Sequence, residues 1–329
     1  MSINVHIKGL GHHVPEKILS NQDLEKIVDT SDEWITSRTG ISNRHIVEDE
    51  TCVDLAYEAS LKALKKAGLE ADDLTHIIVA TFTGDRPLPS ASCLLMERLG
   101  IKQKAAMDIA AACSGFVYGL ETARAFIALH PESKILVVGS EILTSRVNWK
   151  DRSTCVLFGD GAGAAVLTGD DGAEHDGKLL DVVISADGAL SMALAIKGGG
   201  SALPYHLGDN VGEEYFIEMR GREVFKHAVR NMASISKEVL ARHGYTTDDV
   251  DVLVPHQANQ RIIEAVGKKL SIPVEKVFSN VSRFGNTSAA SIPIALSEAK
   301  EIGAIKEGDL VLVTTFGGGL TWGSALLQF

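Results

Sequence analysis

The sequence has few cysteines and no long hydrophobic run, and both absences narrow its class. Its four cysteines lie far apart, form no C-x-x-C pair and have no histidine at metal-ligand spacing. We therefore expect neither a disulfide framework nor a bound metal. The N-terminus lacks a basic stretch followed by an apolar one, and no run of about 18 apolar residues follows, so we expect a cytoplasmic protein with no membrane anchor.

An excess of positive charge is also absent. The 329 residues carry a formal net charge of -11 at pH 7. Nucleic acid is therefore a poor candidate partner, because phosphate backbones bind to basic surfaces. The hydrophobic and charged fractions, 45% and 23%, are those of a folded enzyme rather than of a disordered chain. A chain of this length forms either two ordinary domains or one large α/β unit.

Short apolar runs rich in β-branched residues alternate with segments of helical spacing. The predicted strands are residues 76–81, 134–139, 164–167, 250–254 and 309–315. The predicted helices are residues 90–99, 115–129, 259–270 and 288–302. This alternation is typical of βαβ units and predicts an α/β fold with buried strands.

The order of elements is repeated in the two halves of the chain. Each half ends in a strand, a glycine-rich turn and a last strand. Cys113 follows Val79 by 34 positions (113 − 79), and Asn286 follows Leu253 by 33 (286 − 253). The repeat therefore predicts that Asn286 occupies the place of Cys113 in the second half.

The boundary between the halves is expected near residues 170–178, because residues 169–177 form a polar, glycine-rich stretch. Residues 1–173 would then form an N-terminal half that carries the cysteine, and residues 174–329 a C-terminal half that carries a histidine and the asparagine. We expect the two halves to pack together into one catalytic unit.

Cys113 lies where an apolar, strand-like run meets the start of a helix, among small residues. Backbone N–H groups and the positive end of a helix favour thiolate over thiol, and small neighbours let a thioester approach closely. The pattern thus indicates a nucleophile. A buried cysteine that acts only as a small hydrophobic residue is the alternative, and Cys113 alone does not decide between the two.

His256 and Asn286 are the candidate partners of this cysteine. His256 follows the strand at residues 250–254, at the carboxyl end where α/β sheets build their sites, although it could also serve only its own loop. Asn286 directly precedes a helix, where asparagine is also a favourable N-cap. If the halves face each other, both side chains meet Cys113 in one pocket.

Four segments together resemble the β-ketoacyl-[acyl-carrier-protein] synthase III family of initiating condensing enzymes. They are Ala-Ala-Cys-Ser-Gly-Phe around Cys113, Pro-His-Gln-Ala-Asn around His256, Gly-Asn-Thr-Ser-Ala-Ala-Ser from residue 285, and Phe-Gly-Gly-Gly-Leu-Thr-Trp-Gly from residue 316. The resemblance extends from Thr39 to Phe329. It implies a thiolase-like, five-layered αβαβα fold of the α/β class, built from two duplicated βαβ halves.

Two positions distinguish this chain from related enzymes of the same fold. Thr315 stands where thiolases carry a second cysteine, before the triple glycine. Asn286 stands where elongating synthases carry a second histidine. Both positions favour an initiating synthase.

The resemblance implies a two-step reaction with Cys113, His256 and Asn286 as the catalytic residues. Cys113 would take the acyl group from an acyl-coenzyme A, with acetyl as the expected primer. His256 and Asn286 would then assist the decarboxylation of malonyl-acyl carrier protein, and the products are 3-ketoacyl-acyl carrier protein, coenzyme A and carbon dioxide. Backbone N–H groups of Cys113 and Gly318 would form the oxyanion hole.

The resemblance also implies binding residues and partners. No cofactor is expected beyond acyl-coenzyme A as a substrate, and members of the family are homodimers. Stacking on a purine suits an indole and a guanidinium. The predicted positions are Trp34, Arg38 and Arg152 for coenzyme A, Phe82 and Leu88 for the acyl pocket, and Gln257, Arg261, Lys268 and Lys269 for the acidic carrier protein.

The primer and the reaction class both have alternatives. Leu88 stands where the family commonly has an aromatic residue, and Phe82 where a small one is frequent. A branched, longer or carboxylated primer, as in specialised relatives in secondary metabolism, is therefore an open possibility. The alternatives in other classes are a thioester hydrolase that uses Cys113 and His256, and an inactive fold that only binds acyl-coenzyme A.

Overall fold

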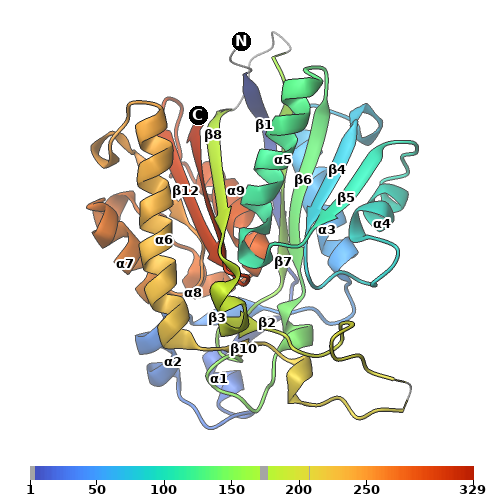
Figure 1. Cartoon of the computed structure of the whole chain (residues 1–329), viewed down its shortest axis with the longest axis vertical. Coiled ribbons are helices and arrows are strands. Elements are labelled where there is room, and N and C mark those ends of the chain that lie inside the picture. Colours follow the sequence, from blue (N-terminus) through green and yellow to red (C-terminus); the bar gives the residue numbers. More distant parts are fainter. Residues whose placement is uncertain (1–3, 171–176, 207) are drawn as a thin grey trace.

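The computed structural model describes residues 4–170, 177–206 and 208–329. Within these residues one large mixed sheet contains nine strands in the order β11-β12-β13-β8-β1-β7-β6-β4-β5 (Figure 1). The strands are β1 (Val5–His13), β4 (His76–Ala80), β5 (Ala105–Ile109), β6 (Lys134–Glu141), β7 (Gly161–Thr168), β8 (Gly177–Ala186), β11 (Val252–Pro255), β12 (Leu310–Gly317) and β13 (Thr321–Gln328).

Helices cover this sheet, and short strand pairs lie beside it (Figure 1). The helices are α1 (Asn21–Leu24), α2 (Asp32–Thr39), α3 (Cys52–Ala67), α4 (Ala91–Arg98), α5 (Gly115–Leu129), α6 (Gly221–Arg242), α7 (Gln260–Leu270), α8 (Val281–Phe284) and α9 (Ser291–Glu301). The short pairs are β2 (Ile18–Ser20) with β3 (Asn43–His45), and β9 (Leu194–Ala195) with β10 (Glu218–Met219). Among the described residues, no helix has both the length and the apolar character needed to cross a membrane.

Alternate side chains of the strands face different helix layers. In β4, Ile77 and Val79 pack in a core with α3 and α4, whereas Ile78 packs in a core with α5 and α9. In β11, Leu253 packs in a core with α6 and α7, whereas Val254 shares the core with α5 and α9. Since strand side chains alternate between faces, the two halves of the sheet enclose α5 and α9 and carry further helices outside. These five layers confirm the predicted fold class.

Both halves use the same strand order. From the edge of the sheet inward, the strands of the first half are β5, β4, β6, β7 and β1, and those of the second half are β11, β12, β13 and β8. Val277 adds a parallel bridge to Leu253 on the outer side of β11, where the first half has β5 beside β4. β1 and β8 pair antiparallel at the junction. The duplication is therefore real, while the predicted boundary at 173/174 lies outside the described residues and stays a prediction.

The register of the repeat differs from the predicted one. A short 3-10 helix precedes the central helix of each half, at Ala112–Ser114 before α5 and at Ser288–Ala290 before α9. Its first residue has a positive φ in both halves, 46° at Ala112 and 50° at Ser288. Cys113 therefore corresponds to Ala289, and the prediction that Asn286 takes its place is wrong by three residues. Since Ala112 corresponds to Ser288, Val79 corresponds to Pro255 and not to Leu253. This slip of two residues is one that the period of two in a strand allows, and the predicted spacing of 33 instead of 34 adds the third.

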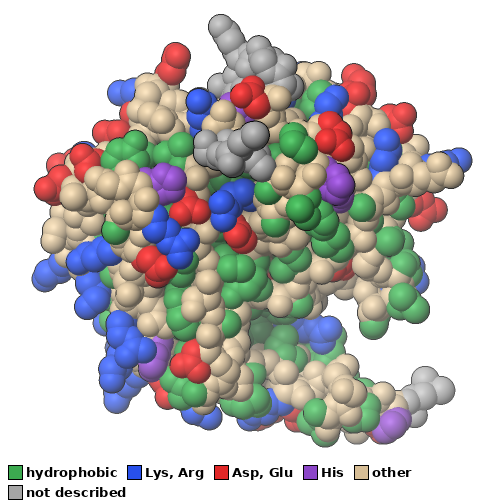
Figure 2. Space-filling view, turned by 45° about the horizontal axis from the view of Figure 1, so that its top comes forward, with side chains coloured by type: hydrophobic (Ala, Val, Ile, Leu, Met, Phe, Trp, Pro, Cys, Tyr) green, Lys and Arg blue, Asp and Glu red, His purple; other side chains and the backbone are tan. Residues whose placement is uncertain are grey.

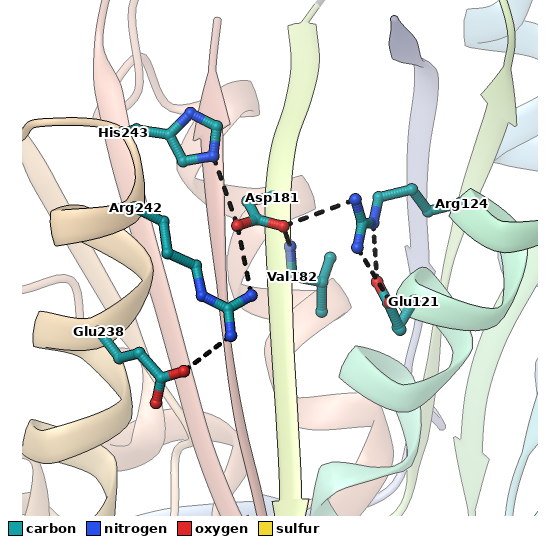
Figure 3. A network of polar contacts seen from close by, with 7 residues as sticks. All are labelled: Glu121, Arg124, Asp181, Val182, Glu238, Arg242 and His243. Atoms are coloured by element: carbon teal, nitrogen blue, oxygen red, sulfur yellow. Dashed lines mark hydrogen bonds and ion pairs between the residues drawn. The ribbon is translucent and has the colours of Figure 1, made fainter. Parts of the chain in front are cut away.

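A polar network fixes α5 and α6 to β8 far from the cysteine end of α5 (Figure 3). Asp181 of β8 is 3.5 Å from Arg124 of α5, 3.8 Å from Arg242 of α6 and 3.4 Å from Nε2 of His243. Two glutamates complete the network by pairing with the arginines, Glu121 with Arg124 and Glu238 with Arg242. One buried carboxylate thus connects two helix layers through the strand between them.

Candidate active site

Cys113 lies in the turn before α5, and the second half of the chain holds that turn in place. The side chain is buried, with 7% of the residue exposed. Thr315 donates a hydrogen bond to the carbonyl of Cys113 at 2.9 Å, and Thr321 donates one to the carbonyl of Ala111 at 2.9 Å. A Cβ at Gly317 would lie 2.7 Å from the nitrogen of Cys113, so only glycine allows this close approach.

The thiol of Cys113 is protonated in the resting protein. Burial raises its pKa to about 12, and the nearby charge of Glu141 raises it further. Burial thus opposes the thiolate that the start of a helix favours. Acyl transfer consequently needs a group that takes the thiol proton.

His256 follows β11 and is neutral. Its backbone N–H donates to the carbonyl of Thr314 at 2.8 Å, which fixes the chain at the end of the strand. Its Nδ1 lies 2.6 Å from the hydroxyl oxygen of Ser291, the first residue of α9. Complete burial lowers the pKa of His256 to about 3, so the ring is an uncharged imidazole at neutral pH.

Asn286 is held on both sides by the backbone of the first half. Its N–H donates to the carbonyl of Leu157 at 2.9 Å, and its carbonyl accepts from the N–H of Gly159 at 3.1 Å. The side-chain oxygen accepts from the N–H of Ser288 at 2.9 Å. The amide NH2 group of Asn286 is therefore left as the hydrogen-bond donor for a ligand.

One cavity is lined by Cys113, His256 and Asn286 together. Its other walls are apolar for the most part: Leu157, Phe158, Leu194, Met219, Val224, Ala228, Met232, Ala258, Asn259, Ile262 and Phe316. A second cavity of about 190 Å³ also includes Cys113. It is lined by Phe82, Ala112, Leu143, Phe158, Leu194, Ala195, Ile196, Ile217, Ser288 and Gly318. The sulfur thus lies between a polar site and an apolar pocket.

Comparison with known proteins gives the family. A family model described as "3-Oxoacyl-[acyl-carrier-protein (ACP)] synthase III" matches residues 107–188, and a model of the C-terminal part of that protein matches residues 240–329. The "Beta-ketoacyl-[acyl-carrier-protein] synthase III" of Oleidesulfovibrio alaskensis is 54% identical over 329 residues, which cover 100% of both chains. The chain belongs to the β-ketoacyl-[acyl-carrier-protein] synthase III family.

Solved structures of the synthase III family have the same fold. The crystal structure of 3-oxoacyl-[acyl-carrier-protein] synthase III from Aquifex aeolicus matches with a TM-score of 0.91 at 47% identity and covers 99% of this chain and 100% of its own. The structure from Pseudomonas aeruginosa has a TM-score of 0.90 at 40% identity, with 99% and 98% covered. The resemblance drawn from the motifs is confirmed, and the chain is a condensing acyltransferase.

The three residues predicted to bind coenzyme A lie together. The guanidinium carbons of Arg38 and Arg152 are each 5.0 Å from the ring centre of Trp34. Arg152 also donates to the carbonyl of Asp29 at 3.0 Å. A planar base between Trp34 and Arg152 needs about 7 Å, twice the usual contact distance. The side chain of Arg152 must therefore move before an adenine can enter.

Two predicted binding residues are placed differently from the expectation. The side chain of Gln257 is buried and bonded to backbone: it donates to the carbonyl of Pro255 at 2.8 Å and accepts from the N–H of Asn280 at 2.9 Å. Gln257 therefore cannot contact a carrier protein and instead braces the turn after β11. Leu88 is 85% exposed and lies outside the acyl cavity of its own chain, because its loop projects before α4. Phe82 does line that cavity.

The predicted basic residues of α7 have basic neighbours on α6. Arg261, Lys268 and Lys269 are exposed, and the guanidinium of Arg261 lies 6.0 Å from the ring centre of Phe225 on α6. The exposed basic residues of α6 that follow helical spacing around this ring are Arg222, Lys226 and Arg230. Figure 2 shows Lys and Arg side chains gathered on this flank of the molecule. The six residues are called the basic flank below.

Three polar residues of the site were not predicted from the sequence. They are Glu141 at the end of β6, Ser288 beside the sulfur and Ser291 beside His256. The two serines offered no signal, because serine near a helix start is commonly a cap. Glu141 did offer one, since a carboxylate at the carboxyl end of an otherwise apolar strand stands where α/β folds place functional groups.

Proposed function

We propose that the chain catalyses the decarboxylative condensation of an acyl-coenzyme A primer with malonyl-acyl carrier protein. The products are 3-ketoacyl-acyl carrier protein, coenzyme A and carbon dioxide, and the reaction begins fatty acid biosynthesis. Membership of the synthase III family over the full length supports this function. The observation that carries the site assignment is the single cavity lined by Cys113, His256 and Asn286.

In the first step the sulfur of Cys113 attacks the thioester carbon of the primer. A carbon–sulfur bond forms to Cys113, the bond to coenzyme A breaks, and the thiol proton finally leaves with coenzyme A. Backbone N–H groups of Cys113 and Gly318 stabilise the transient oxyanion. Gly318 lines the same cavity as Cys113, which supports this assignment.

In the second step His256 and Asn286 stabilise an enolate. Each donates a hydrogen bond to the thioester carbonyl of the malonyl group while carbon dioxide leaves. The resulting carbanion attacks the acyl carbon, and the sulfur of Cys113 is released. A neutral His256 suits this role, because Ser291 can donate to Nδ1 and leave the proton on Nε2.

Acetyl is the proposed primer, and the apolar cavity beside Cys113 receives it. Phe82 and Ile217 form part of its wall. Trp34, Arg38 and Arg152, which lie together, are the proposed contacts of coenzyme A. A volume of about 190 Å³ favours a second candidate, a branched or longer primer, since it leaves space beyond an acetyl group. Neither reaction needs a cofactor besides the acyl-coenzyme A substrate.

The basic flank is the proposed docking surface for the acyl carrier protein. Val224, Ala228 and Ile262 line the cavity from the same two helices, so a carrier docked there lies next to the site. Complementary charge guides association and orientation, and the flank is basic in a chain of net charge -11. The assignment to the cytoplasm, where both substrates would be met, remains a prediction.

A homodimer is the proposed assembly. β5 is the end strand of the large sheet, so one row of its backbone groups has no strand beside it within the described chain. Its side chains Met107 and Ile109 are only half-buried, and Leu88, in the loop before α4, is highly exposed. A second copy paired on β5 would continue the sheet and give these apolar groups a partner.

One assay distinguishes the proposed function from its alternatives. The protein is incubated with acetyl-coenzyme A, with and without malonyl-acyl carrier protein, and the products are identified by mass. We expect an acetylated Cys113 without the carrier and 3-ketoacyl carrier with it, and Cys113→Ala should abolish both. Release of free acetate without the carrier would indicate a thioester hydrolase, and absence of any reaction would indicate a protein that only binds its ligand.

A further inference from the structure

The proposed reaction leaves one proton without an acceptor. Cys113 starts as a thiol and must lose its proton when the sulfur attacks. His256 is the obvious candidate, but burial lowers the pKa of its ring to about 3, which makes it a weak base, and its hydrogen bond with Ser291 suits a donor on Nε2. The acceptor must therefore be sought on the other side of the sulfur.

Ser288 connects Cys113 with a buried carboxylate. Both residues line the apolar cavity, and the hydroxyl of Ser288 lowers the pKa of Cys113, against the larger effect of burial. The same hydroxyl donates to Oε1 of Glu141 at 3.1 Å. The backbone N–H of Ser288 donates to the side-chain oxygen of Asn286 at 2.9 Å, which holds the residue in place. The hydroxyl thus borders the thiol on one side and is bonded to the carboxylate on the other.

One carboxylate oxygen of Glu141 is free of the threonines and is available to Ser288. Its Oε2 accepts from the hydroxyl and N–H of Thr83, the hydroxyl of Thr81 and the N–H of Phe82. Its Oε1 accepts from Ser288. Among the described residues, the titratable groups that sense the charge of Glu141 are the thiols of Cys113 and Cys52, and no Lys or Arg is among the main causes of its own pKa shift.

We propose that Ser288 and Glu141 form the proton relay that activates Cys113, an inference that rests on the proposed function. As the sulfur bonds to the acyl carbon, the thiol proton passes to Oγ of Ser288. The hydroxyl proton of Ser288 passes at the same time to Oε1 of Glu141. When coenzyme A departs as a thiolate, the proton returns through Ser288 to its sulfur, and the carboxylate is restored.

The electrostatics of the pair agree with this relay. Burial raises the pKa of Glu141 to about 7, so the carboxyl can both accept and release a proton near neutral pH. The charge of the carboxylate also raises the pKa of Cys113, so the two groups disfavour being ionised together. A single negative charge is shared between them and moves toward the sulfur when the proton moves away.

The test compares Glu141→Gln and Ser288→Ala with the wild-type protein. The rate of Cys113 acetylation by acetyl-coenzyme A is followed by mass in a single turnover from pH 5 to pH 9. We expect each variant to acylate about 100-fold more slowly at neutral pH, the usual contribution of general base catalysis. In the wild type the rate should rise as Glu141 ionises around pH 7, and in Glu141→Gln this rise should be lost.

A purely electrostatic role for Glu141 predicts the opposite result. Removal of its charge would lower the pKa of Cys113, so Glu141→Gln would acylate faster. Wild-type or faster acylation in Glu141→Gln overturns the relay, and so does wild-type acylation in Ser288→Ala. Asp160→Asn is the matched control, because Asp160 is another buried carboxylate with a raised pKa, bonded to Thr144 outside the cavities. We expect it to acylate normally.

Failure of the relay and failure of the proposed function give different results. If the wild-type protein takes up no acyl group, the proposed function fails. If the wild type is acylated and the variants match it, only the relay fails. Circular dichroism shows whether each variant is folded, and if Glu141→Gln does not fold, Ser288→Ala decides the matter alone, since it removes one exchangeable hydroxyl and no charge.

Discussion

Nδ1 of His256 lies 2.6 Å from the hydroxyl oxygen of Ser291, the residue that begins α9. The two residues are far apart in sequence, and both are buried. A hydroxyl that donates to Nδ1 fixes the proton on Nε2 and orients the ring at the same time. The helix that follows Asn286 therefore also orients the ring of His256.

Ser291→Ala should weaken the second step and spare the first. Without the hydroxyl the imidazole loses its fixed tautomer, so we expect the decarboxylation of malonyl-acyl carrier protein to slow by about tenfold, less than the loss of a direct oxyanion donor. Carbon dioxide release and Cys113 acetylation are measured separately on the same variant. A variant with normal carbon dioxide release would contradict the role of Ser291.

The stability of Glu141→Gln should depend on pH differently from that of the wild type. The folded-state pKa of Glu141 is raised from 4.5 to about 7, so the folded protein binds more protons than the unfolded one in this window. The protonated side chain of Glu141 contributes its full stabilisation below pH 4.5, and this stabilisation is lost as the pH rises to about 7. The free energy of unfolding then falls by at most about 1.4 kcal/mol per pH unit. Relative to the wild type, the Gln variant should gain stability over this range in urea unfolding. A constant difference would show that Glu141 titrates normally.

Arg261→Glu should affect only the carrier substrate. Reversal of one charge on the basic flank weakens its attraction for an acidic partner, so we expect KM for malonyl-acyl carrier protein to rise by about tenfold, with a stronger effect at low salt. KM for acetyl-coenzyme A should not change. Lys306→Glu, an exposed lysine outside the basic flank, serves as the control for net charge. Equal effects of the two reversals would argue against a docking site at Arg261.

Trp34→Ala should raise KM for acetyl-coenzyme A. Stacking of a base on an aromatic ring contributes about 1–2 kcal/mol, which corresponds to about tenfold in binding. The turnover rate at saturation should be retained, because Trp34 is outside both cavities at Cys113. Steady-state kinetics with acetyl-coenzyme A and with a truncated acetyl-pantetheine thioester check the assignment. A loss of equal size with both substrates would mean that Trp34 does not bind the adenine.

Asp181→Asn should destabilise the fold without changing the chemistry. The side chain is 10% exposed and faces Arg124 and Arg242, which lose their common counter-charge in the variant. We expect a loss of about 1–3 kcal/mol in urea unfolding, because the arginines are partly solvated. Glu238→Gln, which removes a half-exposed partner of Arg242, should cost less than about 0.5 kcal/mol. Similar losses in both variants would show that burial of Asp181 has no special effect.

Most of the helices and strands named in the sequence analysis could be predicted from the sequence. The helix predicted at residues 115–129 is α5 without any shift, and the strand predicted at residues 76–81 is β4 to within one residue. These segments could be predicted because each buries one face and therefore repeats apolar residues with a helical or strand period. The residue-by-residue correspondence between the two halves could not be predicted, since a strand pattern with a period of two fits more than one alignment.

The sequence by itself determined the family, the alternation of strands and helices, and the three residues that line the cavity. Local motifs carry that information, because Cys113, His256 and Asn286 each stand at an element boundary that the chain around them specifies. Only the tertiary structure decided that Gln257 faces inward, that Leu88 faces outward, and that Glu141 lies within reach of Ser288. Those relationships depend on contacts between distant segments and on exclusion of water, and both arise only when the two halves pack together.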